Sequence, residues 1–202
     1  MEDMTRRASV GLGLALLCAI GAAAQDPLRR DADGMLRKLE AIDARAKTPA
    51  AARRPPARTT ITDREVNAYF KVYGPAFLPD GVVEPQVAIE DGGRVRAKSI
   101  VDLNAVRAAK PRGWLDPLAY VGGSVEVTAA GTLKTGEGRG QFALESATLG
   151  GVTVPKSLLQ ELVSYYSRSP DLPNGVNLDQ PFELPARIRT VETGRGAATI
   201  VQ

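Results

Sequence analysis

The chain has 202 residues, contains no histidine, has the single cysteine Cys18, and carries a formal net charge of +3 at pH 7. The missing histidine removes the commonest general base and metal ligand, and one cysteine cannot form a disulfide within the chain. Residues 25–58 hold nine basic and five acidic residues, whereas residues 59–202 hold fifteen and sixteen. Because the positive charge lies outside the expected folded domain, a nucleic-acid-binding fold is not expected.

Residues 1–24 have the pattern of an export signal. Two arginines precede an apolar run, and the run ends in small residues, Ala22 and Ala24, that fit a signal-peptidase site. The run has 17 residues, 8–24, at or below the roughly 20 that span a bilayer. We therefore expect cleavage, with an uncleaved anchor as the alternative. Cleavage would remove Cys18 and leave a cysteine-free chain in the periplasm or outside the cell.

Residues 25–58 form a basic segment rich in alanine, proline and arginine, which predicts a linker. Pro55 and Pro56 exclude a helix near its end. Residues 33–46 could form a short helix. The apolar side of that helix would be Met35, Leu36, Leu39 and Ile42. A plain spacer is the first interpretation, and a helix that contacts a membrane surface or a partner is the second.

The folded domain is expected at residues 59–202. Thr62 and Glu65 have the spacing of a capping box, in which each side chain accepts a hydrogen bond from the backbone N–H of the other residue. An amphipathic helix follows and ends at Gly74 and Pro75. Its apolar stripe is Val66, Tyr69, Phe70 and Tyr73.

Alternating apolar and polar residues predict three antiparallel hairpins in this domain. We expect Val83, Val87 and Ile89 on one face of the first hairpin, and Val127 on the inward face of the second. The paired strands are residues 82–90 with 94–103, residues 124–134 with 139–149, and residues 186–192 with 197–202.

A second amphipathic helix begins at Pro155, which suits the first helical position because proline has no N–H to leave unpaired. Leu158, Leu162 and Tyr166 recur at helical spacing on its apolar side. A sheet with one polar and one apolar face needs a cover, and the two helices can supply it. The predicted fold is therefore α+β: a curved antiparallel sheet of about six strands, in three hairpins, covered by two amphipathic helices.

The sequence shows no reaction chemistry, and we expect no catalytic residue, metal or cofactor. Asp102, Glu126 and Glu145 are the candidates for a carboxylate pair, and they fall on polar strand faces among basic neighbours. Solvated surface charge is the plainer interpretation of these residues. A carboxylate-dependent hydrolase is an alternative that requires two of these groups to meet in one cleft.

The remaining functional indication is the size of the apolar side chains that face the core. The inward strand positions are small and the helix stripes are bulky, so the core could be plainly filled or could leave a slot for an acyl chain. Trp114, in an irregular segment, could dip into a membrane interface, cover the mouth of such a slot or pack over an open end of the core. The expected apolar lining is Val66, Tyr69, Phe70, Tyr73, Trp114, Val127, Leu158, Leu162 and Tyr166.

Three short motifs give the domain a family resemblance. They are Ile61-Thr62-x-x-Glu65-Val66-Asn67, Leu78-Pro79-x-Gly81-Val82 and Gly150-Gly151-Val152-x-Val154-Pro155. With them, residues 59–202 resemble small bacterial periplasmic domains grouped with the tubular lipid-binding superfamily. The resemblance implies a strongly curved antiparallel sheet that wraps a long helix around an apolar tunnel. It implies no catalytic motif, and this chain has two medium helices where that family has one long helix.

The expected function is that of an exported, non-enzymatic envelope protein that binds or shields a lipid or another apolar ligand. Peripheral contact with a membrane would go through residues 25–58. The alternative is a periplasmic protein–protein interaction module with a filled core. Such a module would use the loop at residues 167–185, the loop around Trp114 or the edge of the C-terminal strand.

Overall fold

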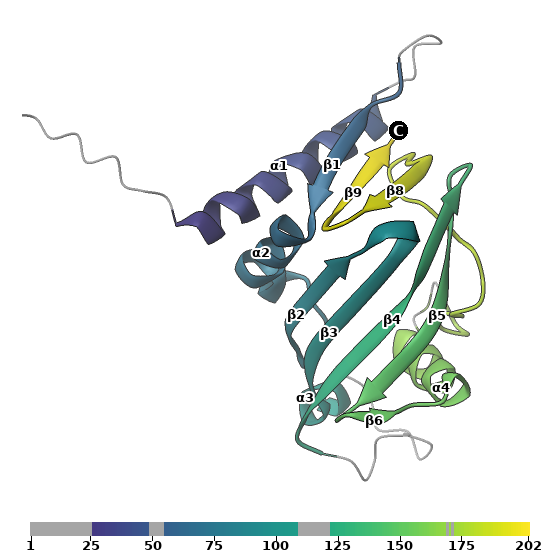
Figure 1. Ribbon diagram of the computed structural model, residues 1–202. Helices are drawn as coiled ribbons and strands as arrows, with labels where there is room; N and C mark the ends of the chain where they lie inside the picture. The colour runs from purple at the N-terminus through teal and green to yellow at the C-terminus, as the bar shows by residue number, and fades with distance from the viewer. Residues whose placement is uncertain (1–25, 49–54, 109–121, 169, 171) are drawn as a thin grey trace, which may run out of the picture.

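The computed structural model describes residues 26–48, 55–108, 122–168, 170 and 172–202 (Figure 1). The expected signal peptide, residues 1–24, lies outside these residues. The described chain combines helices with two antiparallel sheets, and the larger sheet has six strands. The predicted α+β class and its six-stranded antiparallel sheet are therefore confirmed.

The first element, α1, is a helix over Pro27–Lys47. The Asp26 side chain caps its first turn by accepting a hydrogen bond from the Leu28 N–H at 3.1 Å. The buried side chains of this helix are Ala32, Met35 and Ile42. These residues recur at helical spacing, so one side of α1 packs against the rest of the chain. The helix is longer than the predicted residues 33–46, and it belongs to the fold.

The short strand β1 (Arg58–Thr62) leads directly into α2 (Asp63–Tyr73), and the predicted capping box joins them. The Thr62 hydroxyl accepts a hydrogen bond from the Glu65 N–H at 3.2 Å, and the Glu65 carboxylate accepts one from the Thr62 N–H at 2.9 Å. The helix ends where the sequence predicts. A 3₁₀ turn, η1 (Gly74–Ala76), follows it.

The larger sheet has the strand order β2-β3-β4-β5-β6, and β7 pairs with β5 beside this path. Its strands are β2 (Val82–Ile89), β3 (Arg94–Asp102), β4 (Ser124–Gly136), β5 (Arg139–Leu149), β6 (Val152–Thr153) and β7 (Phe182–Glu183). The connecting segments include η2 (Asp91–Gly93), α3 (Leu103–Ala108) and α4 (Lys156–Ser167). The first two predicted hairpins, β2–β3 and β4–β5, are confirmed.

A third hairpin forms near the predicted position, but its first strand begins at Thr190 instead of residue 186, and it lies in a separate three-stranded sheet of order β1-β9-β8. Strand β8 spans Thr190–Gly194 and β9 spans Ala197–Val201. The two sheets contact each other at more than one point. Thr135 of β4 accepts from the Val191 N–H at 2.8 Å and donates to the Val191 carbonyl at 3.0 Å, and the Ile89 carbonyl of β2 accepts from the Gly196 N–H at 2.8 Å. The C-terminal hairpin therefore extends the fold beyond the larger sheet.

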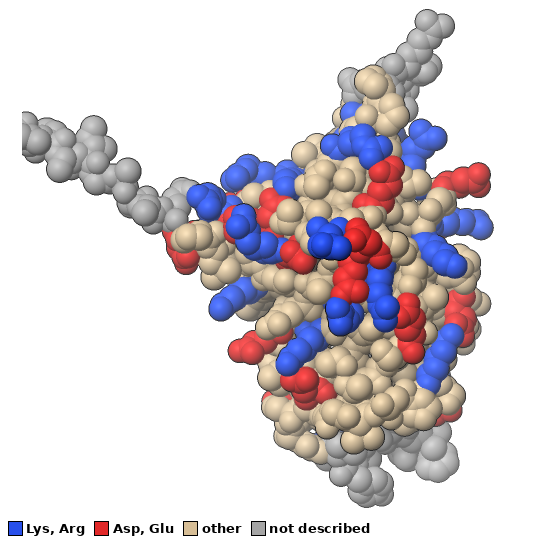
Figure 2. All heavy atoms as spheres, viewed as in Figure 1, with Lys and Arg blue, Asp and Glu red and all other residues tan. Residues whose placement is uncertain are grey.

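The register of the larger sheet separates a small apolar face from a charged face. Ala97 of β3 lies opposite Ala129 of β4, which lies opposite Ala147 of β5. The ion pairs of the charged face include Arg94–Glu145, Arg94–Glu90, Arg96–Glu90 and Lys98–Glu126. Figure 2 shows acidic and basic side chains intermixed over much of the molecular surface.

The best-buried cluster lies between α1 and the smaller sheet. Ile42, Ile188 and Ile200 are 5–8% exposed, and half-buried apolar side chains pack around them. On the apolar face of the larger sheet, Ala147 is buried, whereas Val127 is only half-buried. Within the part of the chain that the structure describes, no helix is both long and apolar enough to cross a membrane.

Candidate functional site

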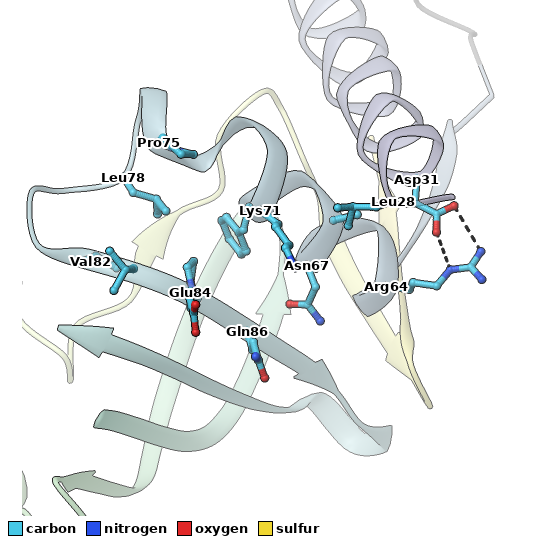
Figure 3. A pocket seen from close by; sticks show the side chains of 14 residues that line it. Leu28, Asp31, Arg64, Asn67, Lys71, Pro75, Leu78, Val82, Glu84 and Gln86 are labelled. Carbon is cyan, nitrogen blue, oxygen red and sulfur yellow. Dashed lines mark hydrogen bonds and ion pairs between the residues drawn. The ribbon is translucent and has the colours of Figure 1, made fainter. Parts of the chain in front are cut away.

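A cleft with a volume of about 730 Å³ runs between α2 with its turn η1 on one side and strand β2 on the other (Figure 3). We call it the β2 cleft. Its apolar lining is Leu28, Ala68, Phe70, Pro75, Leu78, Val82, Val83 and Pro85. Its polar lining is Asp31, Arg64, Asn67, Lys71, Glu84 and Gln86. Leu28 and Asp31, at the start of α1, lie at one end, and Pro75 and Leu78 lie at the other.

Two glycines shape the apolar end of the β2 cleft. The Leu78 N–H donates to the Gly74 carbonyl at 2.8 Å, and a β-carbon on Gly74 would lie only 2.8 Å from Leu78 Cδ1. Glycine therefore lets Leu78 fold back against the end of α2. Gly81 has a φ of 84°, and a β-carbon there would lie 2.6 Å from the Asp102 carbonyl oxygen. Only glycine suits this turn into β2.

Strand β2 is an edge strand of the larger sheet, and α2 binds its free edge. The Asn67 side-chain oxygen accepts from the Val87 N–H at 2.7 Å, and its amide group donates to the Val87 carbonyl at 2.9 Å. Pro85 has no N–H, and the Ile89 carbonyl accepts from the Gly196 N–H at 2.8 Å. These features fix α2 beside β2 and oppose the addition of another strand.

A β-bulge interrupts β2 in the wall of the cleft. The register of its pairing with β3 shifts after Val83, and Glu84 adopts a positive φ of 50°. Val83 pairs with Ile100 and Val87 pairs with Ala97, which lie on opposite faces of β3. The prediction that Val83 and Val87 share a face is wrong, because the bulge shifts the alternation between them.

The charged groups of the β2 cleft differ in their partners. Arg64 forms an ion pair with Asp31 at 3.0 Å, and the Asp31 side chain is only 13% exposed. Lys71 on α2 and Glu84 on β2 line opposite walls of the cleft, and both are exposed. Among the described residues, neither Lys71 nor Glu84 has an ion-pair or hydrogen-bond partner for its side chain. The cleft therefore presents one unpaired cation and one unpaired anion.

Polar contacts from α1 hold the α2 wall in place. The Lys38 ammonium donates to both carboxylate oxygens of Glu65, at 2.6 and 2.8 Å, and the Glu65 side chain is 15% exposed. Burial alone would raise the pKa of Glu65, but hydrogen bonds from Lys38 and Thr62 outweigh it and leave the pKa below its ordinary value. The Tyr73 hydroxyl donates to Asp33, and this hydrogen bond raises the pKa of Tyr73.

The side chains of the predicted apolar stripe of α2 contact different parts of the structure. Of the predicted lining residues that the structure describes, Phe70 lines the β2 cleft. Tyr73 contacts α1 through its hydroxyl, and its ring centroid lies 5.4 Å from that of Tyr69. The Tyr69 ring also stacks on Phe77, with centroids 5.4 Å apart, and Val66 is half-buried.

The other predicted lining residues lie toward the opposite end of the strand order. Helix α4 packs against β5, and its Leu158 is 45% exposed while Leu162 is half-buried. Val127 is half-buried on β4. In Figure 1, α2 lies beside β2 and α4 lies beside β5, so these residues do not join the α2 residues in one lining. Trp114 and the side chain of Tyr166 lie outside the described part of the chain.

The three carboxylates considered for a hydrolase have separate partners. Asp102 accepts a hydrogen bond from a backbone N–H at the start of α3, at 2.9 Å. Glu126 pairs with Lys98 at 2.6 Å, and Glu145 pairs with Arg94 at 2.8 Å. In the described ranges, no cluster of three or more acidic or cysteine side chains could hold a metal ion. Each of these carboxylates therefore interacts with its own neighbouring donor.

Two residues in the sequence, Pro85 and Leu78, indicate features of the β2 cleft, but the alternation of apolar and polar residues does not reveal them. Pro85 lies in the middle of an expected strand, which is typical of an edge strand or a bulge. Leu78 follows soon after the end of the predicted helix, and an apolar residue there can pack back onto that helix. Neither signal indicates which helix faces which strand, so the cleft itself required the structure.

Comparisons of the chain with models of protein families, with curated proteins and with solved structures found no match. The resemblance to the tubular lipid-binding superfamily therefore stays a prediction. The functional interpretation below depends on the geometry of the β2 cleft.

Proposed function

We propose that this protein is an exported, non-enzymatic envelope protein that binds a lipid or another apolar molecule in the β2 cleft. The observation that carries the proposal is a cleft of about 730 Å³ with eight apolar residues among the fourteen that line it. Ligand-binding sites commonly have volumes of about 300–1,000 Å³ and mostly apolar walls with a few polar groups. The export signal expected at residues 1–24 supports a location in the cell envelope.

The exposure of the cleft wall supports binding of an apolar guest. Val83 is 48% exposed, although it stands among other apolar side chains. Full burial of a valine stabilises by about 1.5–3 kcal/mol relative to full exposure, so covering this half-exposed side chain contributes about 1 kcal/mol. A chain-like guest that covers several such residues would gain this contribution at each of them.

A blocked cleft tests the proposal. In the full chain, Val83→Trp adds bulk at a solvent-exposed position of the cleft wall without enlarging a buried core residue. We expect the wild-type chain to bind a fluorescent fatty acid in a titration, and Val83→Trp to bind it at least about tenfold more weakly. Native mass spectrometry of the purified protein should also detect a co-purified apolar molecule.

Val152→Trp is the matched control, because Val152 is 70% exposed on β6 and does not line the cleft. This variant should bind the fatty acid as the wild-type chain does. A wild-type chain that takes up no fatty acid or other amphiphile, at any accessible concentration, would contradict the proposal. Equal weakening in both tryptophan variants would place binding outside the β2 cleft.

Exposed apolar side chains near α4 favour a second candidate function, a protein–protein contact in the envelope. Val152, Leu158 and Phe182 are 70%, 45% and 46% exposed. A photo-crosslinker placed at residue 152 or 158 should give a discrete crosslinked species in the envelope. The same group at Arg195, whose side chain is 93% exposed on the β8–β9 turn, should not. Identical labelling at all three positions would remove this candidate.

A further inference from the structure

We propose that the ligand of the β2 cleft is a zwitterionic amphiphile: an apolar chain whose polar end carries both an ammonium group and an acidic group. This inference rests on the proposed function and adds the chemical class of the ligand. It starts from the two unpaired charges of the cleft, Lys71 on the α2 wall and Glu84 on the β2 wall.

Other charged side chains of the described residues, Lys134 and Glu137 among them, also lack a partner, but they lie outside the β2 cleft, whereas Lys71 and Glu84 both line it. Arg64, in the same cleft, has Asp31 as its partner, and on the charged face of the sheet Arg96 and Lys98 have carboxylates of their own. Glu84 and Lys71 lie within one cleft, yet their side chains form no ion pair with each other. A ligand that lies between the two walls can supply both missing partners.

The backbone holds Glu84 at the cleft at an energetic cost. Its φ of 50° is uncommon for a residue with a side chain and is an unfavourable backbone conformation. Pro85 further restricts the residue before it, which disfavours helical conformations at Glu84. Bulges often redirect a side chain beside a functional site. The bulge in β2 has this effect, because Glu84 lines the cleft.

The position of Lys71 on α2 relative to β2 is also fixed by the structure. It lies one helical turn after Asn67, whose two hydrogen bonds to Val87 fix the distance between α2 and β2. Apolar residues of both walls, among them Phe70 and Val82, lie in the same cleft. The unpaired charges are exposed to solvent and lie beside apolar walls, so an apolar chain that covers these walls would exclude water from around them and strengthen an ion pair there.

Charge balance selects the class of ligand. A fatty acid would satisfy Lys71 but would bring a carboxylate toward Glu84, and an alkylamine would create the reverse conflict with Lys71. A neutral amphiphile would leave both groups without an ionic partner. A zwitterionic head satisfies both, and two sources share this chemistry: an ethanolamine phospholipid, with ammonium and phosphate, and an amino-acid amphiphile, with ammonium and carboxylate.

The test uses the full chain and amphiphiles with the same acyl or alkyl chain. They are a lysophosphatidylethanolamine, an alkyl amino acid, a fatty acid, an alkylamine and a monoacylglycerol. Competition against a fluorescent probe should show at least one zwitterion binding about tenfold more tightly than the singly charged and neutral compounds. The better of the two zwitterions identifies the acidic group. Equal affinity for all five compounds overturns the inference but leaves the proposed function intact, whereas binding of none overturns the proposed function.

Charge-neutralising variants assign the preference to the two side chains. Glu84→Gln should shift the preference toward the fatty acid, and Lys71→Gln should shift it toward the alkylamine, each by about fivefold or more. Glu137→Gln is a matched control, because Glu137 also has a positive φ, of 51°, and lies in the β4–β5 turn outside the cleft. Lys134→Gln, on β4, is the control for the lysine. Unchanged preferences in Glu84→Gln and Lys71→Gln would contradict the inference.

Discussion

Helix α2 borders two hollows of similar size whose lining residues differ in polarity. The β2 cleft has a volume of about 730 Å³ and mostly apolar walls. The second hollow, of about 650 Å³, lies over the charged face of the larger sheet, and we call it the polar hollow. Residues common to both linings are Arg64, Asn67 and Gln86. Eight of the fourteen residues that line the β2 cleft are apolar, against five of the thirteen that line the polar hollow.

The two hollows differ in how their charges are satisfied. In the polar hollow, Lys98 pairs with Glu126 at 2.6 Å and Arg96 pairs with Glu90, all on well-exposed or half-exposed side chains. In the β2 cleft, Lys71 and Glu84 have no such partners within the described chain. Paired surface charges gain little from a ligand, because a ligand must first displace the existing partner. We therefore base the choice of the β2 cleft on its unpaired charges beside apolar walls, and not on its volume alone.

The largest effect should come from the residue that separates the two hollows. Asn67→Ala would leave the Val87 N–H and carbonyl without their partner on the edge of β2. Half-buried backbone groups without partners cost about 1–3 kcal/mol each, so we expect the free energy of unfolding to fall by about 2–3 kcal/mol. Urea denaturation measures this change.

Gln86→Ala is the control for the asparagine variant. Gln86 is exposed and lines both hollows, yet among the described residues its side chain holds no other element in place. A loss of stability in Gln86→Ala as large as that in Asn67→Ala would show that the bidentate contact to Val87 is not what holds the helix.

The second effect concerns the attachment of α1 to the α2 wall. Glu65→Gln keeps the capping box, because glutamine can also accept the Thr62 N–H, but it removes the charge that pairs with Lys38. At neutral pH we expect a loss of about 1–2 kcal/mol, since this carboxylate is nearly buried and accepts charge-assisted hydrogen bonds.

The pH dependence of this variant has a definite sign. The pKa of Glu65 in the fold is lowered, so its carboxylate stabilises the fold fully above the ordinary value of 4.5. That contribution disappears as the pH falls from this value through the lower pKa of the folded state. The difference in stability between wild type and Glu65→Gln should therefore shrink toward acid pH in urea titrations. A difference that stays constant with pH would contradict the role of the ionised group.

The parts of the fold that sequence predicted are local ones. The capping box at Thr62 and Glu65 and the hairpins β2–β3 and β4–β5 depend on residues close in the chain, so spacing and alternation were sufficient. The pairing of β1 with β9 joins residues more than a hundred positions apart, such as Arg58 with Val201. No local pattern in RTTIT indicates that partner.

The candidate site depended mainly on contacts that are not local. The α2 stripe was predicted correctly as amphipathic, but its aromatic residues divide between the cleft, through Phe70, and α1, through Tyr73. Helix α1 could not be placed on α2 from its sequence, because its apolar spacing is equally compatible with a membrane surface or a partner. The bulge at Glu84 places Val83 on the opposite face of the sheet from the predicted one. Pro85 was the only residue in the sequence that indicated a bulge there.

A third variant separates strain from recognition in the β2 cleft. Glu84→Gly should raise the free energy of unfolding by about 0.5–1 kcal/mol, because glycine adopts a positive φ without steric conflict. It should also remove the preference for zwitterionic amphiphiles. Glu137→Gly should give a similar gain in stability with no change in ligand preference. A stability loss in Glu84→Gly would show that the carboxylate has a structural partner after all.

The smallest effect is expected in the polar hollow. Lys98→Gln removes one partner of an ion pair whose side chains are 48% and 46% exposed, and exposed pairs of this kind contribute about 0.2–1 kcal/mol. We expect unfolding to change by no more than about 0.5 kcal/mol, and amphiphile binding not to change at all, in the same urea and competition measurements. A shift of ligand preference in Lys98→Gln comparable to that in Lys71→Gln would mean that α2 does not separate the two hollows functionally. The ligand would then have to extend across the edge of β2, and the paired charges would contribute to recognition as the unpaired ones do.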